Sequence, residues 1–157
     1  MAKVVILMGS KSDLPVADKG ITILKKFGIN YELYVASAQR TPKRVEKIVT
    51  ESDADIFIAI AGVSAALPGF VASMTTRPVI GVPVSGAVNL DALLSVIQMP
   101  PGIPVAAVGL DRGDNAALLA AEIFSVGRSE FRDKMAEYRK EMEKNVIADS
   151  AAVWSHV

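Results

Sequence analysis

The sequence of 157 residues contains no cysteine and one histidine, His156, which is the residue before the last. The absence of cysteine excludes disulfide bonds, thiolate metal sites and a cysteine nucleophile. A histidine in the tail of a chain is a poor candidate for a catalytic base. We therefore expect an active site without an imidazole, the usual proton carrier at neutral pH.

The sequence also lacks an excess of charge of either sign, because 17 Lys and Arg residues balance 17 Asp and Glu residues. Nucleic-acid-binding proteins usually have a basic excess, so we expect no nucleic acid partner. No apolar run is long enough to span a membrane. Met1-Ala2-Lys3 leads directly into an apolar segment without the pattern of a signal peptide, so we expect a cytoplasmic protein.

Hydrophobic residues are abundant, at 51% of the chain, and five short apolar segments alternate with helical patterns. The apolar segments are 4–8, 31–36, 56–60, 79–84 and 104–108. This alternation is typical of βαβ units and a parallel sheet covered by helices on both faces. It predicts a flavodoxin-like three-layer α/β/α domain over residues 1–127, with a five-stranded parallel sheet and no second domain. High hydrophobicity at zero net charge also favours an oligomer.

Residues 128–157 have a different pattern, because the segment from Ser129 to about Val146 is rich in charge. It predicts an extra C-terminal helix with a narrow apolar seam. The seam consists of Phe131, Met135, Tyr138 and Met142. Such a seam packs either on its own domain or on a neighbouring subunit.

Ligands of open parallel sheets bind beyond the carboxyl ends of the strands. Three loops are expected there, at residues 9–13, 37–40 and 61–67. The first places the hydroxyls of Ser10 and Ser12 at a helix start, which favours an anion. In the same loop Asp13 either caps the helix or accepts a hydrogen bond from a sugar, and a capping role alone for Ser12 and Asp13 stays open.

The other two loops suit the same kind of ligand. Arg40 has forked donors that match a phosphate. A cation at the start of a helix is unfavourable unless an anion lies beside it. Gly62 lies in a loop of small residues that lets a flat ligand approach the backbone, although a tight turn explains this composition equally well.

Five motifs together resemble the N5-carboxyaminoimidazole ribonucleotide mutase family, in order and over nearly the whole chain. They are Met8-Gly9-Ser10-Lys11-Ser12-Asp13, Ser37-Ala38-Gln39-Arg40-Thr41-Pro42, Leu67-Pro68-Gly69, the segment from Gln98 to Val105, and the segment from Asn115 to Ala121. The resemblance implies a flavodoxin-like octamer whose active sites lie near subunit contacts. It also implies that CO2 leaves the exocyclic nitrogen of the ribonucleotide and is captured by the ring carbon, with no metal or organic cofactor.

The resemblance also implies roles for individual residues. Ser10, Ser12 and Arg40 are expected to hold the phosphate, and Asp13 the ribose. Gly62 and its neighbours are expected to line the pocket for the carboxylate and CO2. Ser37 and Leu67 are expected among the substrate-binding residues. The remaining position, Gln39, occupies the place of the family's catalytic residue.

Gln39 is the main departure from the family pattern, in which Ser-Ala-His-Arg-Thr-Pro supplies the proton-transferring histidine. The third loop, which ends Ala65-Ala66-Leu67-Pro68-Gly69, also lacks a histidine found in the mutase class. A Gln amide forms hydrogen bonds but does not titrate near neutral pH. We therefore predict nucleotide binding with strongly reduced turnover. Gln39 is either a substitution made to trap substrate or the residue of a natural divergent member.

Other functions remain open or are disfavoured by particular residues. A class II carboxylase that uses free CO2, or a non-catalytic nucleotide-binding oligomer, stays an alternative. A response-regulator receiver needs an acidic residue after the third strand, where Ile60-Ala61-Gly62 stands, and Asp53 and Asp55 precede that strand. A flavodoxin needs aromatic residues around its flavin, and the three loops have none.

Overall fold

The computed structural model describes residues 1–154, so His156 lies outside the described residues. Contacts along the chain divide it into two compact units, Met1–Ala120 and Ala121–Val157, which are described separately. The first unit ends inside helix α5 (Gly113–Ser125), before the boundary at residue 127 expected from the sequence. No helix within residues 1–154 is long and apolar enough to cross a membrane.

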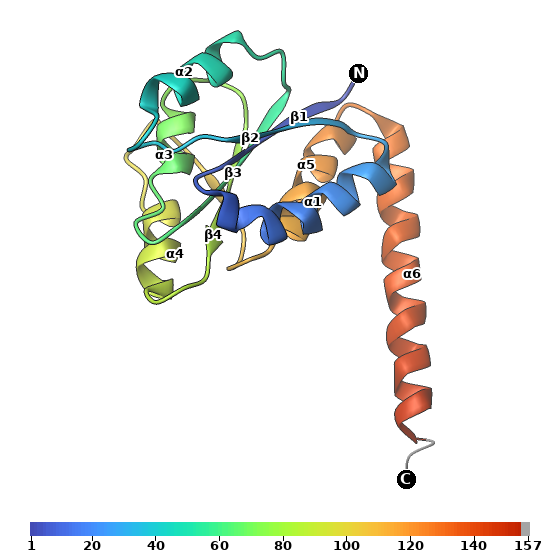
Figure 1. Ribbon diagram of the computed structural model, residues 1–157. Helices are drawn as coiled ribbons and strands as arrows, with labels where there is room; N and C mark the ends of the chain where they lie inside the picture. Colours follow the sequence, from blue (N-terminus) through green and yellow to red (C-terminus); the bar gives the residue numbers. More distant parts are fainter. Residues whose placement is uncertain (155–157) are drawn as a thin grey trace. The chain divides into compact units, whose positions relative to one another are not determined.

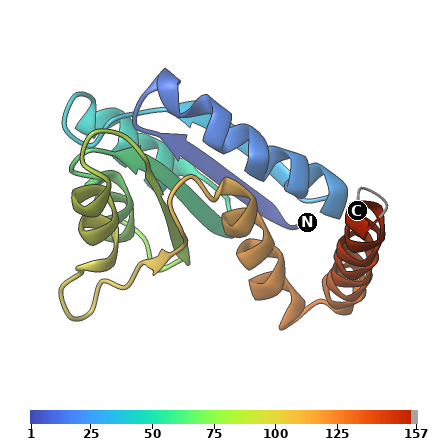
Figure 2. The same cartoon turned by 90° about the horizontal axis from the view of Figure 1, so that it is seen from below.

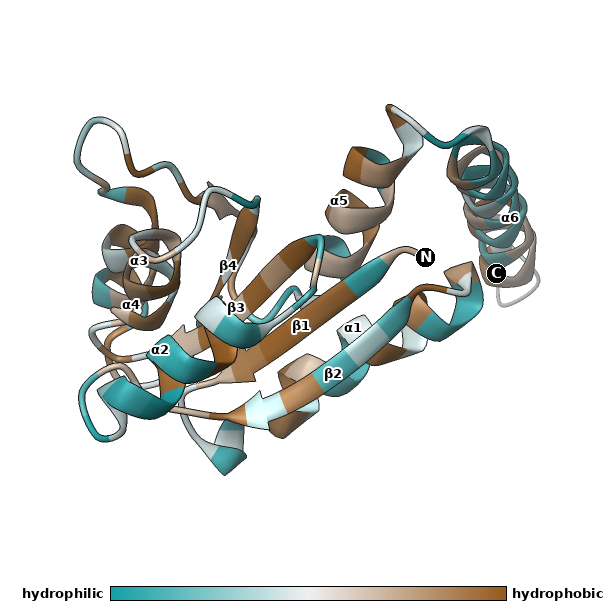
Figure 3. Ribbon diagram, turned by 90° about the horizontal axis from the view of Figure 1, so that it is seen from above, coloured by the Kyte–Doolittle hydropathy of each residue, from teal (hydrophilic) through white to brown (hydrophobic). Residues whose placement is uncertain are grey.

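A sheet of five parallel strands forms the centre of the first unit, in the order β2-β1-β3-β4-β5 (Figure 1). The strands are β1 (Lys3–Met8), β2 (Asn30–Val35), β3 (Ile56–Gly62), β4 (Val79–Val84) and β5 (Ala106–Ala107). Residues 4–8 of β1 are almost fully buried, as expected for a central strand covered on both faces. Edge strand β2 is only half-buried and contains polar residues (Figure 3). The predicted flavodoxin-like fold is confirmed.

Helices cover both faces of this sheet and so make three layers (Figure 2). The helices of the first unit are α1 (Leu14–Phe27), α2 (Pro42–Glu51), α3 (Leu67–Ala72), α4 (Asn89–Ile97) and the first part of α5. Helices α2, α3 and α4 share a core with Val5 and Leu7 on one face. On the other face α1 approaches the start of α5 closely, because a Cβ at Gly20 would lie 2.8 Å from the carbonyl oxygen of Gly113.

Strand β5 is shorter than the predicted segment 104–108. Only Ala106 and Ala107 pair with β4. Pro104 has no backbone N–H to donate to the ladder, which explains the late start of the strand at the edge of the sheet. Beyond the strand, the Val108 N–H still donates to the carbonyl of Gly81 at 3.2 Å.

The second unit contains α6 (Ser129–Trp154), which continues beyond the predicted end near Val146. Phe131 and Met135 of the predicted seam are buried, and the ring centroid of Phe131 lies 5.5 Å from that of Phe124. Met142, farther along the seam, is 50% exposed. Only the first part of the seam is therefore covered within the chain.

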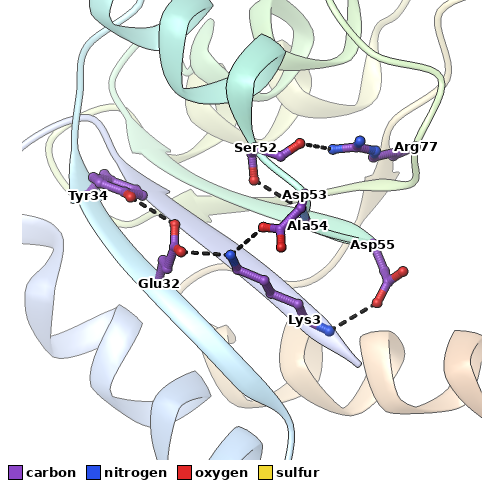
Figure 4. Close-up of polar contacts among 8 residues, drawn as sticks. All are labelled: Lys3, Glu32, Tyr34, Ser52, Asp53, Ala54, Asp55 and Arg77. Atoms are coloured by element: carbon purple, nitrogen blue, oxygen red, sulfur yellow. Dashed lines mark hydrogen bonds and ion pairs between the residues drawn. The ribbon is translucent and has the colours of Figure 1, made fainter. Parts of the chain in front are cut away.

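Lys3 of β1 bonds to residues of β2 and of the segment before β3 (Figure 4). Its ammonium pairs with Glu32 of β2 at 2.7 Å and with Asp53, which precedes β3. The Tyr34 hydroxyl donates to the same Glu32 carboxylate at 2.7 Å. Asp53 and Asp55 thus lie at the amino end of the sheet, away from the ligand-binding edge, as the sequence indicated.

Substitution of Lys3 by Met should lower the melting temperature at pH 7. Lys3 lowers the pKa of Glu32 and of Asp53 from 4.5 and 3.8, chiefly through its hydrogen bonds to them. A carboxyl whose pKa is lowered in the folded state contributes stability above its unfolded pKa and loses that contribution as the pH falls through the folded value. The difference in melting temperature should therefore shrink below about pH 4.

Circular dichroism melts of the original chain and Lys3→Met between pH 7 and pH 3 measure this effect. Lys43→Met, which removes an exposed cation of α2, is the control for net charge. If the difference in melting temperature between the original chain and Lys3→Met stays constant down to pH 3, the ion pairs of Lys3 contribute nothing to stability.

Candidate functional site

The first and third predicted loops meet at the carboxyl edge of the sheet. Strands β1 and β3 pair in register up to Met8 and Ile60, and the Gly9 N–H continues the ladder by donating to the Ile60 carbonyl at 2.9 Å. A Cβ placed on Gly9 would lie 3.7 Å from the Ala61 side chain and 3.7 Å from the Asp13 carboxylate. The two loops are therefore in direct contact.

A cleft of about 270 Å³ opens between these loops and the loop after β4. Its lining residues are Ser12, Asp13, Gly62, Val63, Val84, Ser85, Gly86, Ala87 and Val88. Three of the predicted site residues, Ser12, Asp13 and Gly62, thus share one cleft. Residues 84–88 form the third wall of the cleft and were not predicted, although Ser85-Gly86 is a turn signal directly after a predicted strand. The rule that places ligands at the carboxyl ends of the strands would have included it.

Asp13 is buried at the base of the first loop, where it organises the backbone. Its carboxylate accepts a hydrogen bond from the Ser10 N–H at 2.9 Å, and the Ser10 hydroxyl oxygen accepts from the Ser12 N–H at 3.4 Å. This reciprocal pair is a capping box. Burial raises the pKa of Asp13, while the Ser10 N–H, the Ser12 hydroxyl and the Arg40 charge oppose that rise.

Arg40 connects the second loop to the first. Its guanidinium donates to the Gly9 carbonyl at 2.6 Å, and the side chain is exposed. A guanidinium has five N–H donors, so this bond leaves others for an anion above the first loop. Neighbouring Gln39 is exposed in the same turn.

The structure gives Ser37 and Leu67 different surroundings from the other predicted site residues. Ser37 is 8% exposed, and its hydroxyl accepts from the Arg40 N–H at 3.2 Å, which holds the turn that presents Arg40. The side chain of Leu67 is 2% exposed and packs in the core. Neither lines the cleft, and Ser10, Gln39 and Arg40 also lie outside its lining.

Backbone strain is concentrated around the cleft. Within residues 1–154, two residues other than glycine have positive φ, Val63 at 56° and Asp111 at 59°. A left-handed conformation is unusual for a β-branched residue such as Val63 and costs roughly 1–2 kcal/mol. Strain of this kind collects at functional sites.

A larger cavity of about 980 Å³ lies elsewhere, lined by residues 49–50, 72–79 and 102–104. These residues precede β4 and β5, so the cavity is at the amino end of the sheet. Arg77, the charged residue in its lining, already donates to the Ser52 carbonyl at 2.7 Å. The cleft at the carboxyl end is the better candidate, because ligands of this fold bind there.

Among residues 1–154, no three His, Cys, Asp or Glu side chains are grouped so that they could hold a metal ion. The polar groups around the cleft are hydroxyls, one carboxylate and one guanidinium. Such a set can bind a phosphate and a sugar hydroxyl.

Comparison with known proteins gives consistent matches. The sequence pattern of the family described as AIR carboxylase matches residues 3–145. The N5-carboxyaminoimidazole ribonucleotide mutase of Methanocaldococcus jannaschii is 58% identical over 149 residues, which cover 94% of this chain and 95% of that protein. The mutase of Thermotoga maritima is 45% identical over 152 residues, which cover 94% and 89% of the two chains.

A solved structure has the same fold. The crystal structure of Treponema denticola PurE superposes with a TM-score of 0.87 at 36% identity, covering 97% of this chain and 98% of that one.

Proposed function

The chain belongs to the AIR carboxylase family, and from this we propose that it binds an aminoimidazole ribonucleotide and interconverts its N5-carboxy and 4-carboxy forms in purine biosynthesis. The observation that supports this most is the contact between Arg40 and Gly9, which brings a guanidinium to the hydroxyl-rich first loop beside the cleft. We place this reaction in the cytoplasm.

The phosphate is assigned to Ser10, Ser12 and Arg40. The Ser10 hydroxyl oxygen accepts from the Ser12 N–H, so the proton of that hydroxyl remains available for a ligand. The guanidinium of Arg40 supplies a charge-assisted donor on the same side. A phosphate bound here also neutralises the charge of Arg40, which is otherwise unfavourable just before the start of α2.

The ribose is assigned to Asp13. One carboxylate oxygen accepts from the Ser10 N–H and the other from the Ser12 hydroxyl at 3.4 Å. An ionised carboxylate has about four acceptor sites, so it can accept from a ribose hydroxyl as well. Ser37 acts indirectly in this scheme, by holding the turn that presents Arg40.

The imidazole and the migrating carboxyl group are assigned to the part of the cleft near Gly62. The bond between the exocyclic nitrogen and the carboxyl carbon breaks and releases CO2, and a bond from the ring carbon to CO2 then forms. The ring carbon loses a proton and the nitrogen gains one. Small residues and an exposed backbone let the flat ring and CO2 lie close to the chain.

Gln39 cannot carry the proton between carbon and nitrogen, because its amide does not titrate near neutral pH. General acid–base catalysis is worth about 10²–10⁴-fold in rate. We therefore propose that the chain binds the ribonucleotide and turns it over slowly.

Replacing Gln39 by His should raise kcat for carboxyl transfer by about 100-fold or more, because an imidazole titrates near neutral pH. The assay follows formation of the 4-carboxy product from the N5-carboxy ribonucleotide, and in parallel from the aminoimidazole ribonucleotide with bicarbonate. Glu51→His, which adds an imidazole at the other end of α2, is the matched control. If Gln39→His still binds the nucleotide but gains no activity with either substrate, the chain is a non-catalytic binder.

The assembly is proposed to be a homo-oligomer, with an octamer as the specific expectation. Val63 and Val88 on the cleft are 71% and 40% exposed. In helix α4, which follows Val88 in the chain, Leu90, Leu94 and Ile97 form an apolar face and are 65%, 42% and 49% exposed. Adjacent exposed apolar residues of this kind are typical of protein interfaces. A second copy on this face would also narrow the shallow cleft.

Leu90→Glu should therefore reduce the size of the assembly, because it places a charge on the apolar face. Light scattering after size exclusion is expected to give eight times the 16.6 kDa chain mass for the original protein and a smaller mass for the variant. Lys43→Glu, at an exposed position of α2, should leave the mass of the assembly unchanged. A monomeric original protein would contradict the proposal.

A further inference from the structure

The loop after β4 forms much of the cleft but has little support of its own. It contributes four of the nine lining residues, 85–88, and Val84 at the end of β4 contributes a fifth. Ser85, Gly86 and Ala87 are all exposed. An exposed loop keeps a binding wall in place only when other groups fix it.

Asp111, 26 positions after Ser85 in the chain, holds this loop in place. One oxygen of its carboxylate accepts from the Ser85 N–H at 2.9 Å, and the other accepts from the Ser85 hydroxyl. Hydrogen bonds to an ionised acceptor are about twice as strong as neutral ones. The Ser85 hydroxyl accordingly holds the pKa of Asp111 below its usual value, with help from the Ser85 N–H and the Lys19 charge.

Asp111 is itself held from two sides. Its N–H donates to the Pro83 carbonyl at 2.9 Å, and its carbonyl accepts from the Lys19 ammonium of α1 at 3.0 Å. Its φ of 59° turns the chain so that both backbone groups are bonded while the carboxylate meets Ser85. Asp tolerates this left-handed conformation better than most residues.

Helix capping does not explain these contacts. Helix α5 begins at Gly113, and an N-cap side chain would accept from an N–H of its first turn. Both carboxylate oxygens of Asp111 are instead bonded to Ser85, which belongs to the cleft. The loop is closed from its other side by Asn89, whose side-chain oxygen accepts from the Gly86 N–H at 2.7 Å.

We propose that Asp111 is a positioning residue that fixes residues 85–88 as the third wall of the cleft and thereby sets the affinity for the nucleotide. This inference rests on the proposed function. It also assigns the hydroxyl proton of Ser85 to Asp111, so Ser85 does not donate that proton to the ligand.

Two substitutions at position 111 separate the carboxylate from the backbone conformation. Asp111→Gly removes the side chain and tolerates positive φ, and Asp111→Asn keeps one acceptor but loses the charge. Asp111→Gly should raise the dissociation constant for aminoimidazole ribonucleotide by about 5–10-fold, in line with the loss of two bonds to a charged acceptor. The dissociation constant of Asp111→Asn should lie between those of Asp111→Gly and the original chain. In the Gln39→His background, Asp111→Gly should raise KM and change kcat by less than twofold.

Ser85→Ala is the third variant. It removes one of the two bonds and should raise the dissociation constant by about 2–3-fold. When Ser85→Ala is combined with Asp111→Gly, the dissociation constant should rise no further than in Asp111→Gly alone, because both changes break the same contact. Asp114→Asn, which removes a nearby charge paired with Arg112 at 2.8 Å, should leave the affinity unchanged. A purely structural role for Asp111 would lower the melting temperature without these differences in affinity.

Hydrogen exchange provides a measurement that does not need the ligand. Amides of residues 85–88 should exchange faster in Asp111→Gly than in the original chain, while those of β1 should not change. Equal exchange at 85–88, or equal affinity of the folded variants and the original chain, would overturn the inference. Failure of the original chain to bind the nucleotide would instead overturn the proposed function.

Discussion

The pairing of β1 with β3 is the constraint on which the site depends. Both strands are buried on both faces. Their register is fixed by packing, because a slip of one residue would move every side chain to the opposite face of the sheet. Met8 and Ile60 therefore end their strands side by side, and the first and third loops begin at the same edge. The addition of β4 beside β3 brings the fourth loop to that edge as well.

Short-range patterns were sufficient to predict the fold and part of the site. The alternation of apolar segments with helical patterns identified the layers, and the carboxyl-end rule identified Ser12, Asp13 and Gly62. The contacts of Ser37 and the bonds between Ser85 and Asp111 were not predictable in this way. Both depend on which backbone groups already have partners, and the partner of Ser85 is Asp111, 26 positions away. The late start of β5 follows from Pro104, which the apolar pattern alone did not reveal.

In the proposed function, substrate binding and proton transfer depend on different side chains. The groups assigned to the phosphate and ribose are preorganised by hydrogen bonds within the first loop and by the bridge from Arg40 to Gly9. In this proposal, an exposed amide, Gln39, occupies the position expected for the group that moves the proton. Because binding energy and acid–base chemistry reside in different side chains, one can persist without the other.

A calorimetric titration with aminoimidazole ribonucleotide tests the central claim most directly, when it is performed on the original chain and on Arg40→Gln. The account predicts saturable heat for the original chain and an affinity at least about tenfold lower for the variant, because a charge-assisted contact to phosphate is lost. No heat with the original chain, or equal affinity for the two proteins, would contradict it.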